Sequence, residues 1–171
     1  MRYAFWLIGL LVVVLDQWTK HLVQTTLPFH REVPVIPGFL WFTYTHNKGV
    51  AFGQFQNGGP LLWIAALGAV LGIVYYRARL LRMGIRLHPL LVLGLALPLG
   101  GALGNAIDRV RHGWVIDFID LRWWPIFNVA DSAITLGAVA LVCYFAFVNQ
   151  DAPAPSGEPC VPAGNGGGGG A

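Results

Sequence analysis

Four long apolar runs constrain this sequence more than any other feature. They cover Tyr3–Leu27, Pro60–Tyr76, Leu87–Ile107 and Ser132–Val148. Each run has about 17–25 residues, the length that an α-helix rising 1.5 Å per residue needs to cross a hydrocarbon layer about 30 Å thick. Only 11% of the 171 residues are charged, whereas a soluble domain has about 25%. The sequence therefore predicts a membrane all-α fold with four transmembrane helices, in one domain over residues 1–149.

The first run could instead be a cleaved signal peptide, because Arg2 precedes it as a short basic segment. However, the polar stretch Asp16–Lys20 stands where a small-residue cleavage site would be expected, and the apolar pattern then resumes. We therefore interpret the first run as a span that stays in the protein.

The basic residues predict the orientation in the membrane. Four arginines crowd the short link between the second and third runs, namely Arg77, Arg79, Arg82 and Arg86. Basic links stay in the cytoplasm, so both termini are expected there, and the longer links 28–59 and 108–131 are expected to face outward. The formal net charge of +3 is then mainly a topology signal. No basic face with interleaved aromatic residues indicates a nucleic-acid partner.

Two segments outside the runs have distinct compositions. Val33–Thr45 in the first outer link is rich in β-branched and aromatic residues and contains Pro34, Pro37 and Gly38. This composition is typical of short strands, so we expect a small outward-facing β-sheet in that link. The segment 150–171 is rich in proline and glycine and cannot bury a core, and we expect a disordered cytoplasmic tail.

The tryptophans are unevenly distributed under this topology. Six of the seven fall toward the outer side: Trp18, Trp41, Trp63, Trp114, Trp123 and Trp124. Tryptophan prefers the headgroup level of a bilayer. The excess fits either an ordinary aromatic belt or a surface that accepts a membrane-bound substrate, and the sequence leaves both open.

The acidic residues gather at one depth. Five aspartates lie in the outer half or the outer links: Asp16, Asp108, Asp117, Asp120 and Asp131. An aspartate at the bilayer centre costs about 2.5–3.5 kcal/mol on insertion scales, so such a residue is retained for a partner or a function. Lys20 follows Asp16 by four residues and shares its helical face. A structural ion pair is the simplest interpretation of these two residues.

Two Asn–Asp pairs with the same spacing flank the second outer link. Asn105 and Asp108 end the third run, and Asn128 and Asp131 open the fourth. Residues three apart share one face of a helix. Helix capping would explain Asp131 by itself, but it would not explain why the other acids lie at the same depth.

Asp117 stands among bulky apolar residues in the run Val115–Ile119. A carboxyl in apolar surroundings has a raised pKa, and when two carboxylates are close, one of them holds a proton. Aspartic proteases use that arrangement, in which the ionised carboxylate activates a water and the protonated one donates to the scissile carbonyl.

The aspartates allow several pairings, and spacing does not choose among them firmly. Asp117 and Asp131 have no cation at helical spacing within their own segments, unlike Asp16 with Lys20 and Asp108 with its neighbouring arginines. Asp117 and Asp131 are therefore the better candidates to share a proton.

Other chemistries fit the sequence less well. It contains no His-Glu-x-x-His zinc motif and no Gly-x-Ser-x-Gly nucleophile motif. His46 and His112 lack a second imidazole at ligand spacing, and we expect them to be surface residues rather than bases or ligands. A Mg²⁺ ion held by the aspartates is an alternative, because oxygen ligands suit that ion.

Five motifs in this order resemble those of the lipoprotein signal peptidases, also called signal peptidase II. They are Asp16–Lys20, Asn47–Gly53, Gly101–Arg109, Val115–Phe118 and Phe127–Ile134. The resemblance covers nearly the whole chain from the first span to the fourth, with no departure at a motif position. The glycine-rich tail lies outside it.

The resemblance implies an aspartic endopeptidase of the bacterial inner membrane that works at the outer face without a metal or cofactor. Its substrates would be diacylglyceryl-modified prolipoproteins lying among membrane lipids, cleaved just before the lipidated cysteine. The family's catalytic dyad maps onto Asp117 and Asp131. Nine further positions would support the dyad or hold substrate: Asp16, Lys20, Asn47, Gly49, Asn105, Asp108, Arg109, Asn128 and Ala130.

An alternative class is a non-enzymatic membrane protein, such as a small transporter or channel component that uses Asp16 and Lys20 as an ion relay. That class predicts acids spread through the depth of the bilayer, whereas these acids lie on one side.

Overall fold

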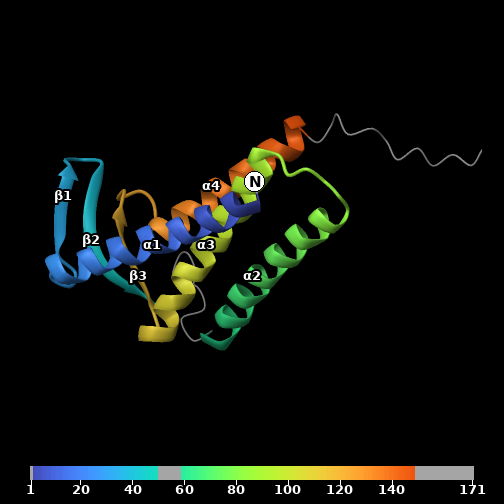
Figure 1. Cartoon of the computed structure of the whole chain (residues 1–171). Coiled ribbons are helices and arrows are strands. Elements are labelled where there is room, and N and C mark those ends of the chain that lie inside the picture. The colour runs from blue at the N-terminus through green and yellow to red at the C-terminus, as the bar shows by residue number, and fades with distance from the viewer. Residues whose placement is uncertain (1, 50–58, 149–171) are drawn as a thin grey trace, which may run out of the picture.

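The computed structural model describes residues 2–49 and 59–148 (Figure 1). The elements follow the order α1 (Arg2–Thr26), β1 (Glu32–Ile36), β2 (Leu40–Asn47), α2 (Gly59–Arg82), α3 (Pro89–His112), β3 (Val115–Asp120), α4 (Val129–Cys143) and a π-helical turn η2 (Tyr144–Val148). Four helical segments are long and apolar enough to cross a membrane. This confirms the predicted fold class of four spans with a small sheet. The predicted tail, 150–171, lies outside the described residues.

The helices form a bundle around α3, which packs against each of the other three helices. Glycines permit these close approaches. A Cβ on Gly100 would lie 2.6 Å from the carbonyl oxygen of Gly9 in α1, and a Cβ on Gly94 would lie 2.6 Å from the Leu141 side chain in α4. Small residues at such crossings let helix backbones come together in a membrane.

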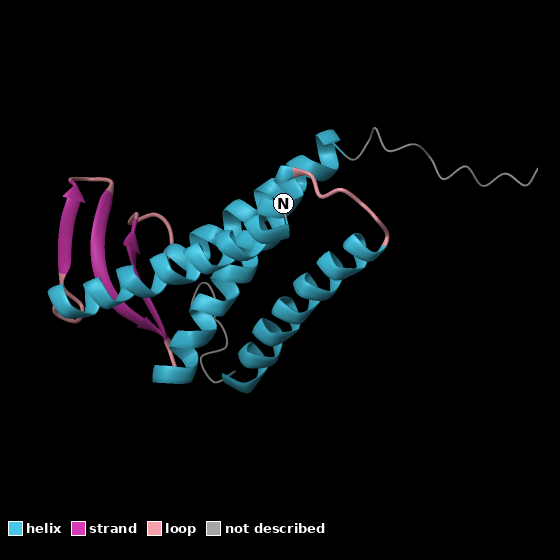
Figure 2. Cartoon of the chain, in the orientation of Figure 1, coloured by secondary structure: helices cyan, strands magenta, loops and turns pink. Residues whose placement is uncertain are grey.

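Three strands lie beside one end of the bundle (Figure 2). Their order is β1-β2-β3, with both pairs antiparallel. The first two strands confirm the sheet predicted for the first outer link. The third strand comes from the second link, where Val115–Ile119 had been interpreted only as the apolar surroundings of Asp117. We call this end of the bundle the sheet end and the opposite one the far end.

Two of the predicted helical runs ended too early. α2 runs on to Arg82 and α3 to His112, so Asp108 lies on a helix rather than in a link. Basic residues in a last helical turn are favourable because they face the negative end of the helix dipole. α3 then ends at Gly113, whose φ of 81° is left-handed and suits glycine. This termination turns the chain directly into β3.

The far end holds the apolar core. Its buried cluster comprises Phe5, Leu80, Leu87, Leu91, Val92, Leu95, Ala96 and Leu99. The guanidinium of Arg77 lies 4.4 Å above the ring centroid of Phe5, a cation–π contact that partly compensates a buried charge. Packing at this end therefore ties α1, α2 and α3 together away from the sheet.

Candidate active site

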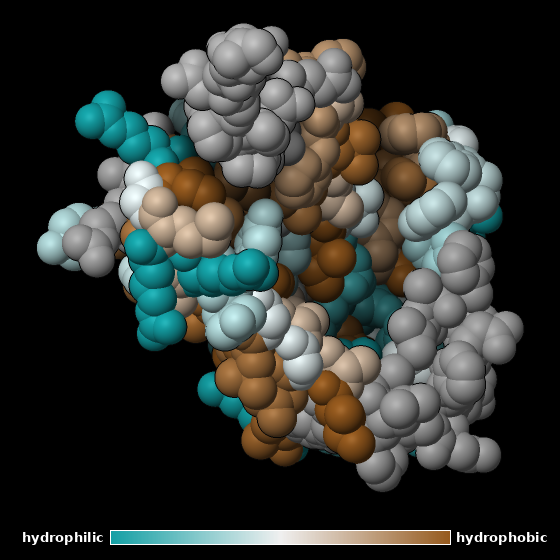
Figure 3. Space-filling view, turned by 90° about the vertical axis from the view of Figure 1, so that its right-hand side faces the viewer, coloured by the Kyte–Doolittle hydropathy of each residue, from teal (hydrophilic) through white to brown (hydrophobic). Residues whose placement is uncertain are grey.

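A cavity of about 860 Å³ lies at the sheet end. Its lining includes Asp117 and Asp131, together with Ala66 of α2 and Ile134 of α4. Figure 3 shows a hollow with hydrophilic residues at its floor and hydrophobic residues along part of its rim. The cavity thus combines a polar floor with walls that are compatible with lipid.

Asp117 lies on β3 with its side chain almost fully buried. Its Oδ2 accepts a hydrogen bond of 2.9 Å from the Asn47 amide, and its Oδ1 accepts one of 2.7 Å from the Asn128 amide. Burial, followed by the nearby charge of Asp131, raises the pKa of Asp117 to about 7. At neutral pH this carboxyl is therefore protonated in a large fraction of molecules.

Asp131 sits in the first turn of α4, in a capping box with Asn128. The backbone N–H of Asp131 donates to Asn128 Oδ1, and the backbone N–H of Asn128 donates to Asp131 Oδ2. The amide of Asn105 donates to Asp131 Oδ1 at 2.8 Å. The Asp131 carboxylate thus accepts two hydrogen bonds at the N-terminus of α4, the positive end of the helix dipole. Asp131 therefore takes part in capping α4, and it also lines the cavity.

Asn128 connects the two aspartates. It is fully buried, and its amide nitrogen lies 2.7 Å from Asp117 Oδ1, 3.2 Å from Asn105 Oδ1 and 3.3 Å from the carbonyl oxygen of Ile116. The two Asn–Asp pairs seen in the sequence therefore meet in one hydrogen-bonded network around the cavity floor.

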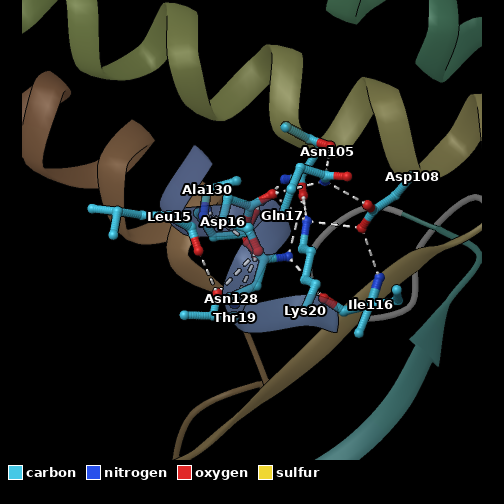
Figure 4. A network of polar contacts seen from close by, with 12 residues as sticks. Leu15, Asp16, Gln17, Thr19, Lys20, Asn105, Asp108, Ile116, Asn128 and Ala130 are labelled. Atoms are coloured by element: carbon cyan, nitrogen blue, oxygen red, sulfur yellow. Dashed lines mark hydrogen bonds and ion pairs between the residues drawn. The ribbon is translucent and has the colours of Figure 1, made fainter. Parts of the chain in front are cut away.

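Behind this floor lies a buried ionic cluster (Figure 4). Lys20 Nζ lies 2.8 Å from Asp16 Oδ2, 2.8 Å from Asp108 Oδ2 and 2.9 Å from Asn105 Oδ1. The predicted Asp16–Lys20 ion pair is confirmed. The other carboxylate oxygen of Asp16 accepts the backbone N–H of Ala130 at 2.9 Å. The cluster thus ties α1, α3 and the start of α4 together.

The partner of Asp108 was not evident from the sequence. Sequence proximity had suggested neighbouring arginines, but the ion pair in the described structure is with Lys20. Asp108 Oδ2 also accepts the backbone N–H of Ile116 at 3.1 Å, which fixes the start of β3. Arg111 instead donates to the side chain of Gln17, and Gln17 donates to Asp108 Oδ1 at 2.8 Å.

Gln17 and Gly104 lie inside the motifs Asp16–Lys20 and Gly101–Arg109, but neither of them had a predicted role. A Cβ on Gly104 would lie 2.5 Å from Asp16 Oδ2, so glycine makes room for the carboxylate there. Gln17 lies inside the Asp16–Lys20 motif. The position of Gln17 directly after Asp16 is the sequence signal that could have indicated a role for Gln17.

The remaining predicted residues border the cavity from other elements. Asn47, at the end of β2, accepts the backbone N–H of Gly49 on its Oδ1 at 2.9 Å. Arg109 donates to the carbonyl oxygens of Asn105 and Gly49, each at 3.4 Å. The structure thus brings the predicted dyad residues and the nine supporting positions into one connected region. Val50–Gly53 of the second motif lie outside the described residues.

His46 is more enclosed than the expected surface residue. Its ring stacks on Trp114 at 4.6 Å and packs on Phe29 at 4.3 Å, and its Nε2 lies 3.0 Å from the Tyr44 hydroxyl. Burial, followed by the nearby charge of His112, lowers the pKa of His46. Within residues 2–49 and 59–148, no group of three or more His, Cys, Asp or Glu side chains is arranged to hold a metal ion.

With this geometry in place, comparison with known proteins identifies the family. Residues 8–147 match the family described as signal peptidase (SPase) II. The chain belongs to the signal peptidase II family. The predicted resemblance is therefore confirmed.

Relatives of known name support the same family. The chain is 44% identical over 138 residues to the lipoprotein signal peptidase of Moorella thermoacetica, covering 80% of this chain and 89% of that protein. It is 42% identical over 147 residues to the lipoprotein signal peptidase of Symbiobacterium thermophilum, covering 84% and 94%. A bacterial membrane enzyme solved by the in meso method at 2.3 Å resolution is 30% identical, with a TM-score of 0.76 over 91% of this chain and 94% of that one. Signal peptidase II proteins are proteases, and these relatives are bacterial.

Proposed function

We propose that this chain is an aspartic endopeptidase that removes the signal peptide from diacylglyceryl-modified prolipoproteins, cleaving just before the lipidated cysteine. The observation that carries the proposal is the pair of aspartates, Asp117 and Asp131, on one cavity in a chain with four apolar spans. Membership of the signal peptidase II family supports the same activity.

The surroundings of the two carboxyls favour different roles. Asp131 receives hydrogen bonds from the Asn105 amide and from a backbone N–H at a helix N-terminus, so it suits the ionised base. Asp117 lies on a buried strand with a pKa raised to about 7 by burial and by Asp131, so it suits the acid that starts protonated.

The proposed reaction starts with a water between the two carboxyls. Asp131 takes a proton from the water as its oxygen bonds to the scissile carbonyl carbon, while Asp117 gives its proton to the carbonyl oxygen. The resulting carbon carries two hydroxyl groups. Asp131 then gives its proton to the leaving nitrogen, the C–N bond breaks, and one hydroxyl returns its proton to Asp117. The products are a carboxylic acid and an amine, and both aspartates regain their starting states.

The other network residues position this pair. Asn105 is held by Lys20 on its oxygen side and by Asp131 on its nitrogen side, so the amide orientation follows from the lysine charge. Lys20 is held in turn by Asp16 and Asp108. Arg109 lies on the cavity beside Gly49, and we assign these two to holding the substrate backbone.

The lipid on the substrate would place the scissile bond. Burial of acyl chains contributes about 0.8 kcal/mol per methylene, and that remote binding energy orients the peptide over the carboxyls. The cavity borders Ala66 of α2 and Ile134 of α4, which are lipid-compatible side chains on two spans. The arginines of α2 lie at the far end, which supports a cytoplasmic far end and a sheet end at the outer face.

The proposal is tested with purified protein in detergent and a diacylglyceryl-modified precursor peptide. Asp117→Asn and Asp131→Asn should each lower kcat by at least about 10²–10³-fold, because each removes a proton-transfer group. Arg79→Gln, a charge removal on α2 at the far end, should cleave at the wild-type rate. If either Asn variant is folded and still cleaves at close to the wild-type rate, the dyad assignment is wrong.

A chelator separates the aspartic mechanism from the magnesium alternative. The aspartic mechanism needs no metal, so EDTA should leave cleavage unchanged. Inhibition by EDTA that added Mg²⁺ reverses would instead support a metal held by the aspartates.

A further inference from the structure

One side chain spans all three strands of the sheet. Arg122 follows β3, and its guanidinium lies 4.2 Å above the ring centroid of Trp41 on β2. Its Nη2 then reaches Glu32 Oε2 on β1 at 2.6 Å. Asp120 on β3 pairs with Trp41 in the sheet and lies 3.7 Å from Arg122 Nε. In the described sheet, β1 pairs only with β2. The side chain of Arg122 therefore links β1 to the end of β3.

The backbone at Arg122 is strained. Its φ is 68°, and the N–H of Trp123 donates to the carbonyl oxygen of Leu121 at 2.8 Å across it, which makes a γ-turn centred on Arg122. Residues in such conformations persist only where the surroundings hold them, and they gather at functional sites. Here the N–H of Arg122 donates to Asp120 Oδ1 at 2.8 Å, and Asp120 Oδ2 accepts the Thr43 hydroxyl.

The strained turn opens a loop that forms one wall of the cavity. The loop leaves β3 after Asp120 and returns at Phe127, whose N–H and carbonyl group both hydrogen-bond with Ile119. Between these points the segment 124–127 lines the cavity. The next residue is Asn128, which holds Asp117. The direction in which the chain leaves Arg122 therefore decides where this wall stands.

We infer that Arg122 is a positioning residue for the substrate. It fastens the β1–β2 hairpin and the cavity-wall loop into one unit, and so holds that wall where the precursor peptide binds. This inference rests on the proposed function. Arg122 does not line the cavity, so its loss should weaken substrate binding and leave the chemical step unchanged.

The main test is a kinetic comparison on the diacylglyceryl-modified precursor peptide. Arg122→Asn removes the guanidinium but keeps a residue that tolerates positive φ. Its KM should rise by up to about fivefold, because the lost cation–π contact and exposed ion pair set an upper bound on the free energy that holds the wall in place, and kcat should stay within about twofold. Arg31→Gln, which removes a neighbouring exposed arginine outside this arrangement, should change neither value. An unchanged KM in a folded Arg122→Asn, or a loss in kcat alone, would overturn the inference.

A second measurement does not depend on cleavage. In hydrogen–deuterium exchange, the amides of β1 and β2 should exchange faster in Arg122→Asn than in wild type or Arg31→Gln. Glu32→Gln should give a smaller change, and combining it with Arg122→Asn should add little, because both remove the same contact. Faster exchange with an unchanged KM would make Arg122 structural only and overturn its positioning role. If neither the wild type nor any variant cleaves the peptide, the proposed function is wrong. The exchange measurement would still test whether Arg122 links the strands of the sheet.

Discussion

The two ends of the bundle share α1 and α3, but they are buried in opposite ways. At the far end, α1, α2 and α3 meet through apolar side chains such as Phe5, Leu80 and Leu91. At the sheet end, α1, α3 and α4 meet through Lys20 and Asn105 and their partners. A buried polar network is costly unless every member is satisfied. The sheet end is therefore the part of the fold in which stability and chemistry depend on the same contacts.

Removing the central cation of the sheet end should have the largest effect on this part of the fold. In the wild type, the carboxylates of Asp16 and Asp108 each lie 2.8 Å from Lys20 Nζ. Lys20→Met would leave both carboxylates without this ion-pair partner. Breaking a buried pair in this way costs about 3–5 kcal/mol. Unfolding midpoints in detergent should fall accordingly, and Asn105 should lose its orientation, so cleavage should fail as well. A variant as stable as the wild type would show that the cluster does not hold the sheet end together.

The matching change at the far end should separate stability from chemistry. Leu91, 1% exposed in the apolar cluster, is not one of the residues that line the cavity. Leu91→Ala should lower the free energy of unfolding by about 2–5 kcal/mol. At temperatures where the variant stays folded, its KM and kcat should equal those of the wild type. A changed kcat in folded Leu91→Ala would mean that the two ends are coupled.

The two ends also differ in how far the sequence could predict them. Helical length and hydropathy suffice for the spans, because the bilayer sets both. The Asp16–Lys20 pair follows from one helical spacing. The contact between Lys20 and Asp108 joins residues 88 positions apart on two helices, and no local spacing encodes which faces of two helices meet. The ion-pair partner of Asp108 therefore had to come from the structure.

The third strand shows a different limit. β3 is buried at Val115, Ile116 and Phe118 as well as at Asp117, so its sequence does not alternate between apolar and polar residues. A short continuous apolar run cannot be assigned to a strand by periodicity alone. Asp117 was noticed because it interrupts that run, but its donors Asn47 and Asn128 come from distant segments. The catalytic roles themselves stay predictions.

The crossing of α3 and α4 at the sheet end leaves no room for a side chain at Gly101. A Cβ on Gly101 would press into the carbonyl oxygen of Ala130 and lie 2.8 Å from the Ile134 side chain. Backbone cannot give way as a side chain can, so Gly101→Ala should cost about 1–3 kcal/mol by overpacking. Gly72→Ala is the matched control on α2, because nothing lies within 4 Å of its Cβ position, and it should be neutral or slightly stabilising. Equal unfolding midpoints for the two variants would contradict close α3–α4 packing at this site.

The sheet end should also give cleavage a dependence on pH. Burial and the charge of Asp131 raise the pKa of Asp117 from 3.8 to about 7. Because the proposed acid must be protonated, kcat should decline above pH 7 by up to about tenfold per pH unit. Leu91→Ala should show the same decline, since the far end has no part in it. A rate that is flat between pH 7 and pH 9 would rule out Asp117 as the acid.

The raised pKa of Asp117 also predicts how stability depends on pH. A paired carboxylate with a lowered pKa makes the folded state more stable as pH rises, whereas Asp117 should make it less stable. Between pH 3.8 and about 7 the folded protein binds more protons at Asp117 than the unfolded chain does. The contribution of Asp117 to the free energy of unfolding should therefore fall as pH rises through that window and level off above it. Asp117→Asn cannot titrate at this position, so the free energy of unfolding of the wild type minus that of the variant should decrease as pH rises over the same range. Unfolding measured in detergent for both proteins tests this, and an identical pH slope would place the titrating group elsewhere.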